Sequence, residues 1–428
     1  MMNLQTLKSR RELLRSFGHL GIVGVSSTLY PGWMPRLVFS PRYQNNAPGQ
    51  RDVLVAIFQR GGMDGLNAVI PFGEGSLYYD RRPTIAIPEP DGSALAAIDL
   101  DGHFGLHPAL RPLKDVWDAG SLGLIHGAGS PDPTRSHFDA MEYMERGTPG
   151  DRSTAAGWIN RHLLSAAWQN DSPFRAVGIG AMVQGSLRGM APALALQSIA
   201  DFHLQGRDDQ LEAVSRTIAG LYNITAPADL LSAQASEVFD TVNLLSQMSN
   251  LDYTPAYGAA YPESAFGIGL QQVAQLIKAD VGLEVAAVDI GGWDTHESQG
   301  GAEGEFASLL SDLGQGLAAF YTDMQDYMSG VTVVTMSEFG RRVDENASAG
   351  TDHGHGNVMM VMGGGITSGM YGRWVGLGSD VLDDSALAVT TDYRDVLSEI
   401  LIKRLGNSAI DQVFPGYSMN PLNIFQAR

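Results

Sequence analysis

The stretch GGWDTHESQG, residues 291–300, gathers side chains that could bind a metal ion or move a proton. Asp294, His296 and Glu297 follow directly after the apolar run LEVAAVDI at residues 283–290. Glycines and ionisable side chains are poor material for a hydrophobic core, so this pattern indicates a site at the end of a buried strand. An isolated Asp-x-His can also be a turn with a capping aspartate, and this alternative stays open.

Further metal-capable side chains stand beside other apolar runs. Asp64 lies in a glycine-rich turn, Glu338 follows a run directly, and His353 and His355 precede one. A carboxylate that leaves a buried strand needs a cation or strong hydrogen-bond donors, because an unpaired buried charge is costly. Oxygen and imidazole groups suit Zn²⁺ or Mn²⁺ or, with more oxygens, Mg²⁺ or Ca²⁺. The predicted ligands of a divalent metal ion are therefore Asp64, Asp294, His296, Glu338, His353 and His355.

A serine in the segment TRSHFDAME is the remaining group of chemical interest. Ser136 stands between Arg135 and His137, and a serine hydroxyl becomes a good nucleophile only when a base or a metal ion activates it. These three residues are predicted to be catalytic. Arg135 could also hold an anionic substrate together with Arg341 and Arg342, because a guanidinium group matches the oxygens of phosphate or sulfate. Alternatively, Ser136 caps a helix that begins near His137, and both interpretations can hold.

The elements that must position these residues can be read from the apolar pattern. Continuous apolar runs indicate strands covered on both faces. Between them lie helical patterns, the clearest over residues 303–328, so we expect an α/β fold: a three-layer α/β/α sandwich with a mostly parallel central sheet. Ligands of such sheets collect beyond the carboxyl ends of the strands. The predicted strands are residues 53–58, 122–126, 174–180, 283–290, 331–336 and 358–363.

The length and composition bound the domain organisation. With 428 residues and 44% hydrophobic content, the chain can bury a substantial core. We expect one domain over residues 50–428, within which residues 205–280 form a helical insertion or side layer. Residues 40–50 have the composition of a linker.

The charge and the N-terminus bear on partners and location. A formal net charge of −19 argues against a nucleic-acid partner. The absence of cysteine excludes disulfides and thiolate chemistry. The segment SRRELLR at residues 9–15, with the apolar stretch that follows, looks like a twin-arginine export signal within residues 1–45, although an amphipathic first helix is the alternative. We expect a periplasmic or secreted protein, delivered by the twin-arginine translocase, without a membrane span in its mature form.

Six ordered motifs carry a family resemblance. RGGMDGLN, GLHPALRPL, TRSHFDAME, GGWDTH, SEFGRR and GTDHGHGN resemble the bacterial family named domain of unknown function 1501, over nearly the whole mature chain. That family is grouped with the alkaline phosphatase-like superfamily, which includes sulfatases and phosphodiesterases. The resemblance implies an alkaline phosphatase-like α/β/α fold and a metal-assisted hydrolase ancestry, but it supplies no substrate.

The resemblance also implies roles for individual residues. Asp64 would correspond to the first acidic metal ligand of the superfamily and Ser136 to its nucleophile. One departure is Phe339, which stands where the superfamily usually has a histidine, and this puts a site with two metal ions in doubt.

Two classes of function follow. The first is an exported metal-dependent hydrolase that acts on a small-molecule or glycan ester of phosphate or sulfate. The second is a non-catalytic periplasmic binding or assembly protein that keeps the metal ion for stability. A serine hydrolase of the G-x-S-x-G type is a third and weaker alternative, because that motif does not occur.

Overall fold

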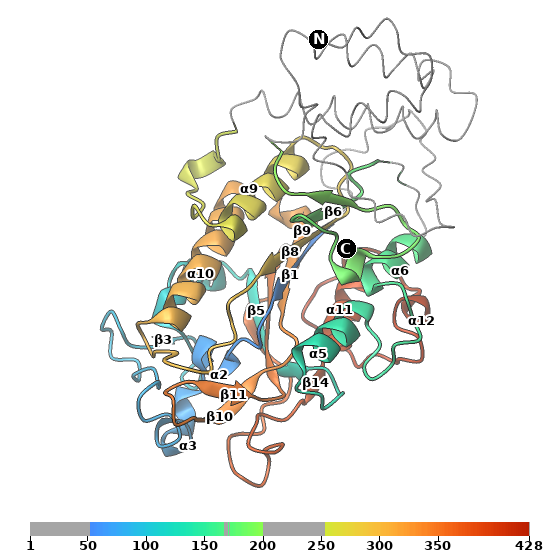
Figure 1. Ribbon diagram of the computed structural model, residues 1–428. Coiled ribbons are helices and arrows are strands. Elements are labelled where there is room, and N and C mark those ends of the chain that lie inside the picture. Colours follow the sequence, from blue (N-terminus) through green and yellow to red (C-terminus); the bar gives the residue numbers. More distant parts are fainter. Residues whose placement is uncertain (1–51, 167–169, 171, 200–252, 428) are drawn as a thin grey trace, which may run out of the picture.

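The computed structural model of the protein describes residues 52–166, 170, 172–199 and 253–427. Its centre is a nine-stranded sheet (Figure 1) in the order β13-β5-β12-β9-β1-β8-β6-β7, with β14 paired to β5. All six predicted strands belong to this sheet. Its strands are β1 (Val53–Gln59), β5 (Leu122–Gly129), β6 (Ala176–Ile179), β7 (Leu194–Leu196), β8 (Val285–Ile290), β9 (Val331–Met336), β12 (Asn357–Gly363), β13 (Gly369–Tyr371) and β14 (Thr391–Asp392).

The sheet is mostly parallel, as predicted. β1 pairs in parallel with β8 and with β9. Among the described strands of this sheet, β12 alone runs in the opposite direction, because it pairs antiparallel with both β9 and β5. The start of β12 therefore lies at the edge where its neighbours end.

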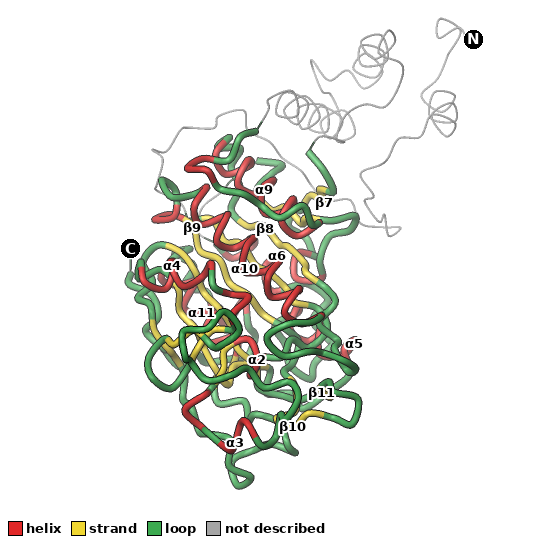
Figure 2. Tube along the Cα trace, turned by 90° about the vertical axis from the view of Figure 1, so that its left-hand side faces the viewer, coloured by secondary structure: helices red, strands yellow, loops and turns green. Residues whose placement is uncertain are grey.

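Helices cover both faces of the sheet, which confirms the predicted three-layer α/β/α sandwich. Alternate residues of β1 point to opposite faces: Val55 and Ile57 join one core cluster, and Leu54 and Ala56 join the other. Figure 1 shows α9 and α10 on one side of the sheet and α6, α11 and α12 on the other, and Figure 2, turned by 90°, looks onto the sheet from the side of α9 and α10. The helices are α4 (Pro112–Asp118), α5 (His137–Arg146), α6 (Trp158–Ser165), α9 (Ala265–Lys278), α10 (Glu305–Asp323), α11 (Tyr393–Lys403) and α12 (Ile410–Val413).

Two smaller sheets and several short helical turns complete the described fold. β10 (Arg341–Glu345) and β11 (Thr351–His353) form an antiparallel pair, which lies near the end of the molecule that carries α3 (Figure 1). β2 (Val69–Ile70), β3 (Ile98–Asp99) and β4 (Gly105–Leu106) form a three-stranded sheet. The short helical elements are α2 (Gly65–Ala68), η2 (Phe72–Glu74), α3 (Ser76–Tyr79), η3 (Pro108–Leu110), η4 (Gly185–Leu187), η5 (Ala256–Gly258) and η6 (Met328–Gly330).

Some predicted segments lie outside the described residues. These are the export signal and linker, residues 1–45 and 40–50, and the larger part of the predicted helical segment 205–280. Its described end contains the helix α9, and strands from both sides of the segment share the central sheet. Within the described part of the chain, no helix has the length and apolar character needed to cross a membrane.

Candidate metal centre

The candidate site lies at the edge of the sheet where the parallel strands end. Gln59 at the end of β1 is in register with Ile290 at the end of β8, and Phe58 is in register with Met336 at the end of β9. Because β12 is antiparallel, the segment that precedes it arrives at this same edge, and Asn357 lies opposite Ala128 of β5. The loops that follow β1, β5, β8 and β9 therefore meet the loop that precedes β12.

A glycine after β1 allows two of these loops to touch. Gly61 has a φ of 124°, a region that favours glycine. A Cβ atom at this position would lie 2.7 Å from the backbone nitrogen of Asp294, closer than side-chain carbons approach. The loop after β1 thus packs directly against the loop that carries Asp294.

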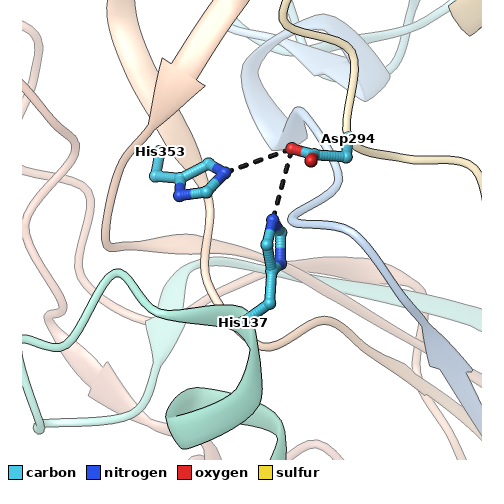
Figure 3. A group of neighbouring side chains, drawn as sticks. All are labelled: His137, Asp294 and His353. Carbon is cyan, nitrogen blue, oxygen red and sulfur yellow. Dashed lines mark hydrogen bonds and ion pairs between the residues drawn. The ribbon is translucent and has the colours of Figure 1, made fainter.

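The centre of the site is the group formed by His137, Asp294 and His353 (Figure 3), whose ligand-capable atoms all lie within 4.8 Å of one another. Oδ1 of Asp294 lies 3.3 Å from Nε2 of His137 and 3.1 Å from Nε2 of His353. His137 begins α5, Asp294 follows β8 and His353 ends β11. Three segments far apart in the sequence are therefore brought together by the fold.

His296 extends this group. Its Nε2 atom lies 3.1 Å from Oδ1 of Asp294 and 2.9 Å from Nε2 of His353. Three imidazole Nε2 atoms thus surround one carboxylate oxygen. The side chains remain partly accessible, with exposed fractions of 23% for His137, 22% for His353 and 47% for Asp294.

The opposite nitrogen of each ring contacts an oxygen that can only accept a hydrogen bond. Each Nδ1 must therefore carry the proton, and in a neutral ring Nε2 then presents a lone pair to the centre. Two such lone pairs 2.9 Å apart, beside a carboxylate, repel each other unless a metal ion or a proton lies between them. The acceptors are Oε1 of Glu338 for His137 at 2.7 Å, the carbonyl oxygen of Arg135 for His353 at 2.9 Å and Oδ1 of Asp352 for His296 at 3.1 Å.

The local charges keep the carboxylate ionised. Burial opposes the ionisation of Asp294, but the hydrogen bond from Arg341 and the positive charge of that guanidinium group outweigh it and lower its pKa to about 2. The hydrogen bond to Glu338 raises the pKa of His137. Burial lowers the pKa of His353, which favours its neutral form. The two histidines thus differ in how readily they hold a proton.

Arg341 organises the site instead of facing a substrate. Its side chain is fully buried, and its guanidinium group donates to Oδ1 of Asp294 at 2.7 Å and to the carbonyl oxygen of Thr351 at 2.7 Å. It also donates to the carbonyl oxygens of Gly61 and Trp293. The expectation that Arg341 holds an anionic substrate is wrong, because its hydrogen-bonding capacity is used within the protein.

Glu338 has the strong donors that its burial requires. It accepts hydrogen bonds from the backbone nitrogen of Gly61 at 2.8 Å and from His137 at 2.7 Å, and Ser337 donates to its second oxygen at 3.2 Å. The structure therefore places Glu338 behind His137 and not among the converging atoms. Such a carboxylate fixes the orientation of a metal-binding histidine.

Two other predicted ligands lie outside the group. Asp64 is buried and pairs with Arg82 at 2.6 Å and with Gln299 at 2.7 Å. His355 contacts Asp383 at 2.5 Å and the carbonyl oxygen of Ser130 at 2.9 Å. The structure does not bring either residue to the centre. No sequence pattern marked Arg82, which neutralises the charge of Asp64.

The remaining predicted residues have clear local roles. Ser136 caps α5, where its hydroxyl accepts a hydrogen bond from the backbone nitrogen of Asp139 at 3.5 Å, which confirms the alternative interpretation of this residue. His137, predicted as catalytic, is one of the converging side chains. Asp352 was not among the predicted ligands, although it lies in the segment GTDHGHGN and orients His296.

The residues present fit a divalent metal ion. Nε2 of His137 is buried and makes no hydrogen bond in the described structure. The ligand atoms of a tetrahedral Zn²⁺ site are about 3.4 Å apart, because each lies about 2.0–2.1 Å from the ion. The separations of 2.9–3.3 Å from His296 to His353 and from Asp294 to the three imidazoles are close to this value, and the ligand-capable atoms of His137, Asp294 and His353 all lie within 4.8 Å of one another. The described structure therefore contains a His/Asp group of suitable composition and spacing.

Comparison with known proteins assigns the family. The model of the family described as "Protein of unknown function (DUF1501)" matches residues 119–406. The chain belongs to this family, which confirms the resemblance of its motifs. Among curated protein sequences, no match to the chain was found.

Solved structures with detectable similarity include members of the alkaline phosphatase superfamily. A superfamily protein from Vibrio parahaemolyticus is 10% identical, with a TM-score of 0.35, and the match covers 83% of this chain and 66% of that chain. The sulfatase PsFucS1 from Pseudoalteromonas sp. is 11% identical, with a TM-score of 0.37, and the match covers 89% of this chain and 74% of that chain. A variant of the alkaline phosphatase PafA is 10% identical, with a TM-score of 0.33, and the match covers 70% of this chain and 64% of that chain. The chain thus spans less than two thirds of the first and the last of these proteins.

Proposed function

We propose that the chain is a metal-dependent hydrolase of phosphate or sulfate esters. The observation that carries this proposal is the convergence of three histidine Nε2 atoms on the Asp294 carboxylate, with each Nδ1 atom engaged by an oxygen. The partial exposure of this group favours a reactive centre over a purely structural metal site, since structural sites are closed to substrate.

The roles of the protein residues follow from their contacts. When bound, a divalent ion would supply Lewis-acid chemistry and would lower the pKa of a nearby hydroxyl group or water. Glu338 holds the Nδ1 proton of His137 and so keeps Nε2 available. Arg341 maintains the charge of Asp294. We propose Ser136 as the nucleophile, because it directly precedes His137 and, among the residues that the structure describes, its hydroxyl group makes only a long capping contact.

The substrate class is supported by charge at the rim of the site. Arg135 and Arg342 both place guanidinium groups near Asp384, with side-chain exposed fractions of 27% and 36%. Partly exposed arginines can bind the oxygens of a phosphate or sulfate group through paired hydrogen bonds. The chain as a whole carries a formal charge of −19, so an anionic substrate requires local positive charge of this kind.

Export through the twin-arginine route is also part of this proposal, supported by Arg10 and Arg11 in the segment SRRELLR. Replacement of both residues by lysine should leave the protein in the cytoplasm. Unchanged recovery from the periplasm would contradict export by this route.

The test of the catalytic proposal combines metal analysis with ester hydrolysis. We expect the purified protein to contain a divalent metal and to cleave p-nitrophenyl phosphate or p-nitrophenyl sulfate, with loss of activity after chelation. His353→Ala should lower metal content and activity by about tenfold or more, comparable to the loss of a supporting contact in a metal site. His103→Ala, which removes a histidine outside the group, is the control.

The outcomes separate the two function classes. A protein that binds metal through His353 but cleaves no phosphate or sulfate ester would favour the non-catalytic periplasmic binding or assembly protein. A protein that contains no metal and does not respond to chelator would contradict both.

A further inference from the structure

A carboxylate of the protein bridges the two arginines at the rim of the candidate metal centre. Oδ2 of Asp384 lies 2.5 Å from a guanidinium nitrogen of Arg135 and 3.4 Å from one of Arg342. Asp384 itself is exposed, with an accessible side-chain fraction of 67%. Two guanidinium groups that share one oxyanion form the arrangement by which proteins bind phosphate, sulfate and carboxylate groups.

The carboxylate is presented by a tight turn. Asp384 and the next residue, Ser385, have φ angles of 45° and 65°, a conformation that side chains other than glycine rarely adopt. The turn is closed by a bridge between Asp383 and Ala386, and the carbonyl oxygen of Ser385 accepts a hydrogen bond from Val343 at 2.9 Å. The backbone thus holds the Asp384 carboxylate over the arginine pair.

Both arginines adjoin the candidate centre. The carbonyl oxygen of Arg135 accepts the hydrogen bond of His353 at 2.9 Å. Arg342 follows Arg341, which bonds to Asp294, and its charge acts on Asp352. The two arginines are therefore carried by segments that also position His353 and Asp294.

We propose that Arg135 and Arg342 form an anion subsite whose internal occupant is the Asp384 carboxylate, and that a sulfate or phosphate group of the substrate displaces it. This inference rests on the proposed ester substrate for its biological meaning, but the subsite itself does not require the metal ion. An exposed ion pair contributes little to stability, so the carboxylate can leave at small cost. Its negative charge meanwhile weakens the binding of any other anion.

The experiment measures the binding of inorganic sulfate and inorganic phosphate to the chelated protein by isothermal titration calorimetry. Asp384→Asn removes the competing charge and keeps a residue that tolerates the left-handed turn. We expect this variant to bind the preferred anion about two- to fivefold more tightly, the change typical of losing an exposed ion pair. Asp384→Gly, which also suits the turn, should behave in the same way and guards against a folding defect in one variant.

Arginine variants complete the test. Arg135→Gln and Arg342→Gln should each weaken anion binding by about tenfold, since each removes a charge-assisted hydrogen-bond donor. Arg81→Gln is the matched control, because Arg81 forms a comparable surface pair with Asp344 at 3.8 Å. It removes the same net charge and should leave anion binding unchanged.

The proposal is overturned if the chelated wild type and the Asp384 variants bind neither anion, or if both Asp384 variants bind no more tightly than the wild type. The latter result would mean that Asp384 positions the arginines instead of competing for them. Because the assay uses chelated protein and no ester, its failure is distinct from a failure of the hydrolase proposal, which is measured by metal content and turnover.

Discussion

At the scale of single residues, the candidate site depends on which nitrogen of each histidine faces the centre. Glu338, the carbonyl oxygen of Arg135 and Asp352 each accept a hydrogen bond from the Nδ1 atom of one ring. The acceptors are a buried carboxylate, a backbone carbonyl and a half-exposed carboxylate, so each ring is fixed by a different kind of group. The arrangement leaves the Nε2 atoms as the groups available for a cation.

Glu338→Gln tests this orienting role. The substitution preserves the size of the side chain but removes the charge that holds the Nδ1 proton of His137 at 2.7 Å. We expect metal affinity to fall by about 10- to 100-fold, the usual effect of losing such a supporting contact. The measurement is a competition titration with a chromophoric chelator. Glu345→Gln, which alters a carboxylate that bonds to Thr84, should leave the affinity unchanged, and an equal loss in both variants would contradict the role of Glu338.

At the scale of elements, the site depends on the direction of one strand. The loops after β1, β8 and β9 share an edge because these strands are parallel. β12 brings His353 to the same edge only because it is antiparallel, so that its preceding loop lies where the other strands end. The β10-β11 pair then fixes His353 opposite Arg341 in its register.

Gly61→Ala tests the close approach of two of these loops. A Cβ atom at Gly61 would lie 2.7 Å from the backbone nitrogen of Asp294 and 3.0 Å from the backbone of Trp293, so the loops must separate. We expect a loss of stability of about 1–3 kcal/mol or more and weaker metal binding. Gly102→Ala is the matched control, since Gly102 also has a positive φ, of 84°, but has open space where the Cβ would lie. Thermal unfolding measures the stability of both variants, and metal titration measures their affinity for the ion. Similar losses of stability and affinity in the two variants would mean that backbone strain alone is responsible.

At the scale of the whole molecule, the three layers enclose histidines that must stay neutral. His126 on β5 is fully buried and lies 2.7 Å from the carbonyl oxygen of Val69, and burial lowers its pKa from 6.5 to about 4. Burial likewise lowers the pKa of His162 on α6 to about 3. These two residues lie outside the candidate metal group, so they report on the folded sandwich itself.

Acid should therefore destabilise the protein. The unfolded chain binds a proton at His126 near pH 6.5, whereas the folded chain binds it only near pH 4. The contribution of this residue is thus fully present above pH 6.5 and is lost as the pH falls towards 4. The loss is at most about 3.5 kcal/mol, at about 1.4 kcal/mol for each unit of pKa difference.

Denaturant unfolding at several pH values in the presence of chelator measures this loss. His126→Gln should show a shallower decline between pH 6.5 and 4 than the wild type, while His103→Gln, which changes a more exposed histidine, should follow the wild type. A decline that is identical in the His126 variant would assign the acid sensitivity to other groups.

Much of the fold could be predicted from the sequence, because its signals are local. Six continuous apolar runs identified strands of the central sheet, and the apolar stripe over residues 303–328 identified α10, which the structure bounds at Glu305–Asp323. The alternation of runs and helices determined the three layers, since each apolar face must be covered. The polar strand ends also located the edge that carries the site.

The composition of the site was decided only by the tertiary structure. Asp294, His296 and His353 were predicted as ligands and do converge, but sequence spacing could not show that His137 joins them. Nor could it show that Asp64 turns away to Arg82, a partner 18 residues along the chain. Strand ends reveal which residues reach one edge of a sheet. Which of them meet depends on the direction of β12 and on where buried arginines find their carboxylates, and both are settled by packing between segments distant in sequence.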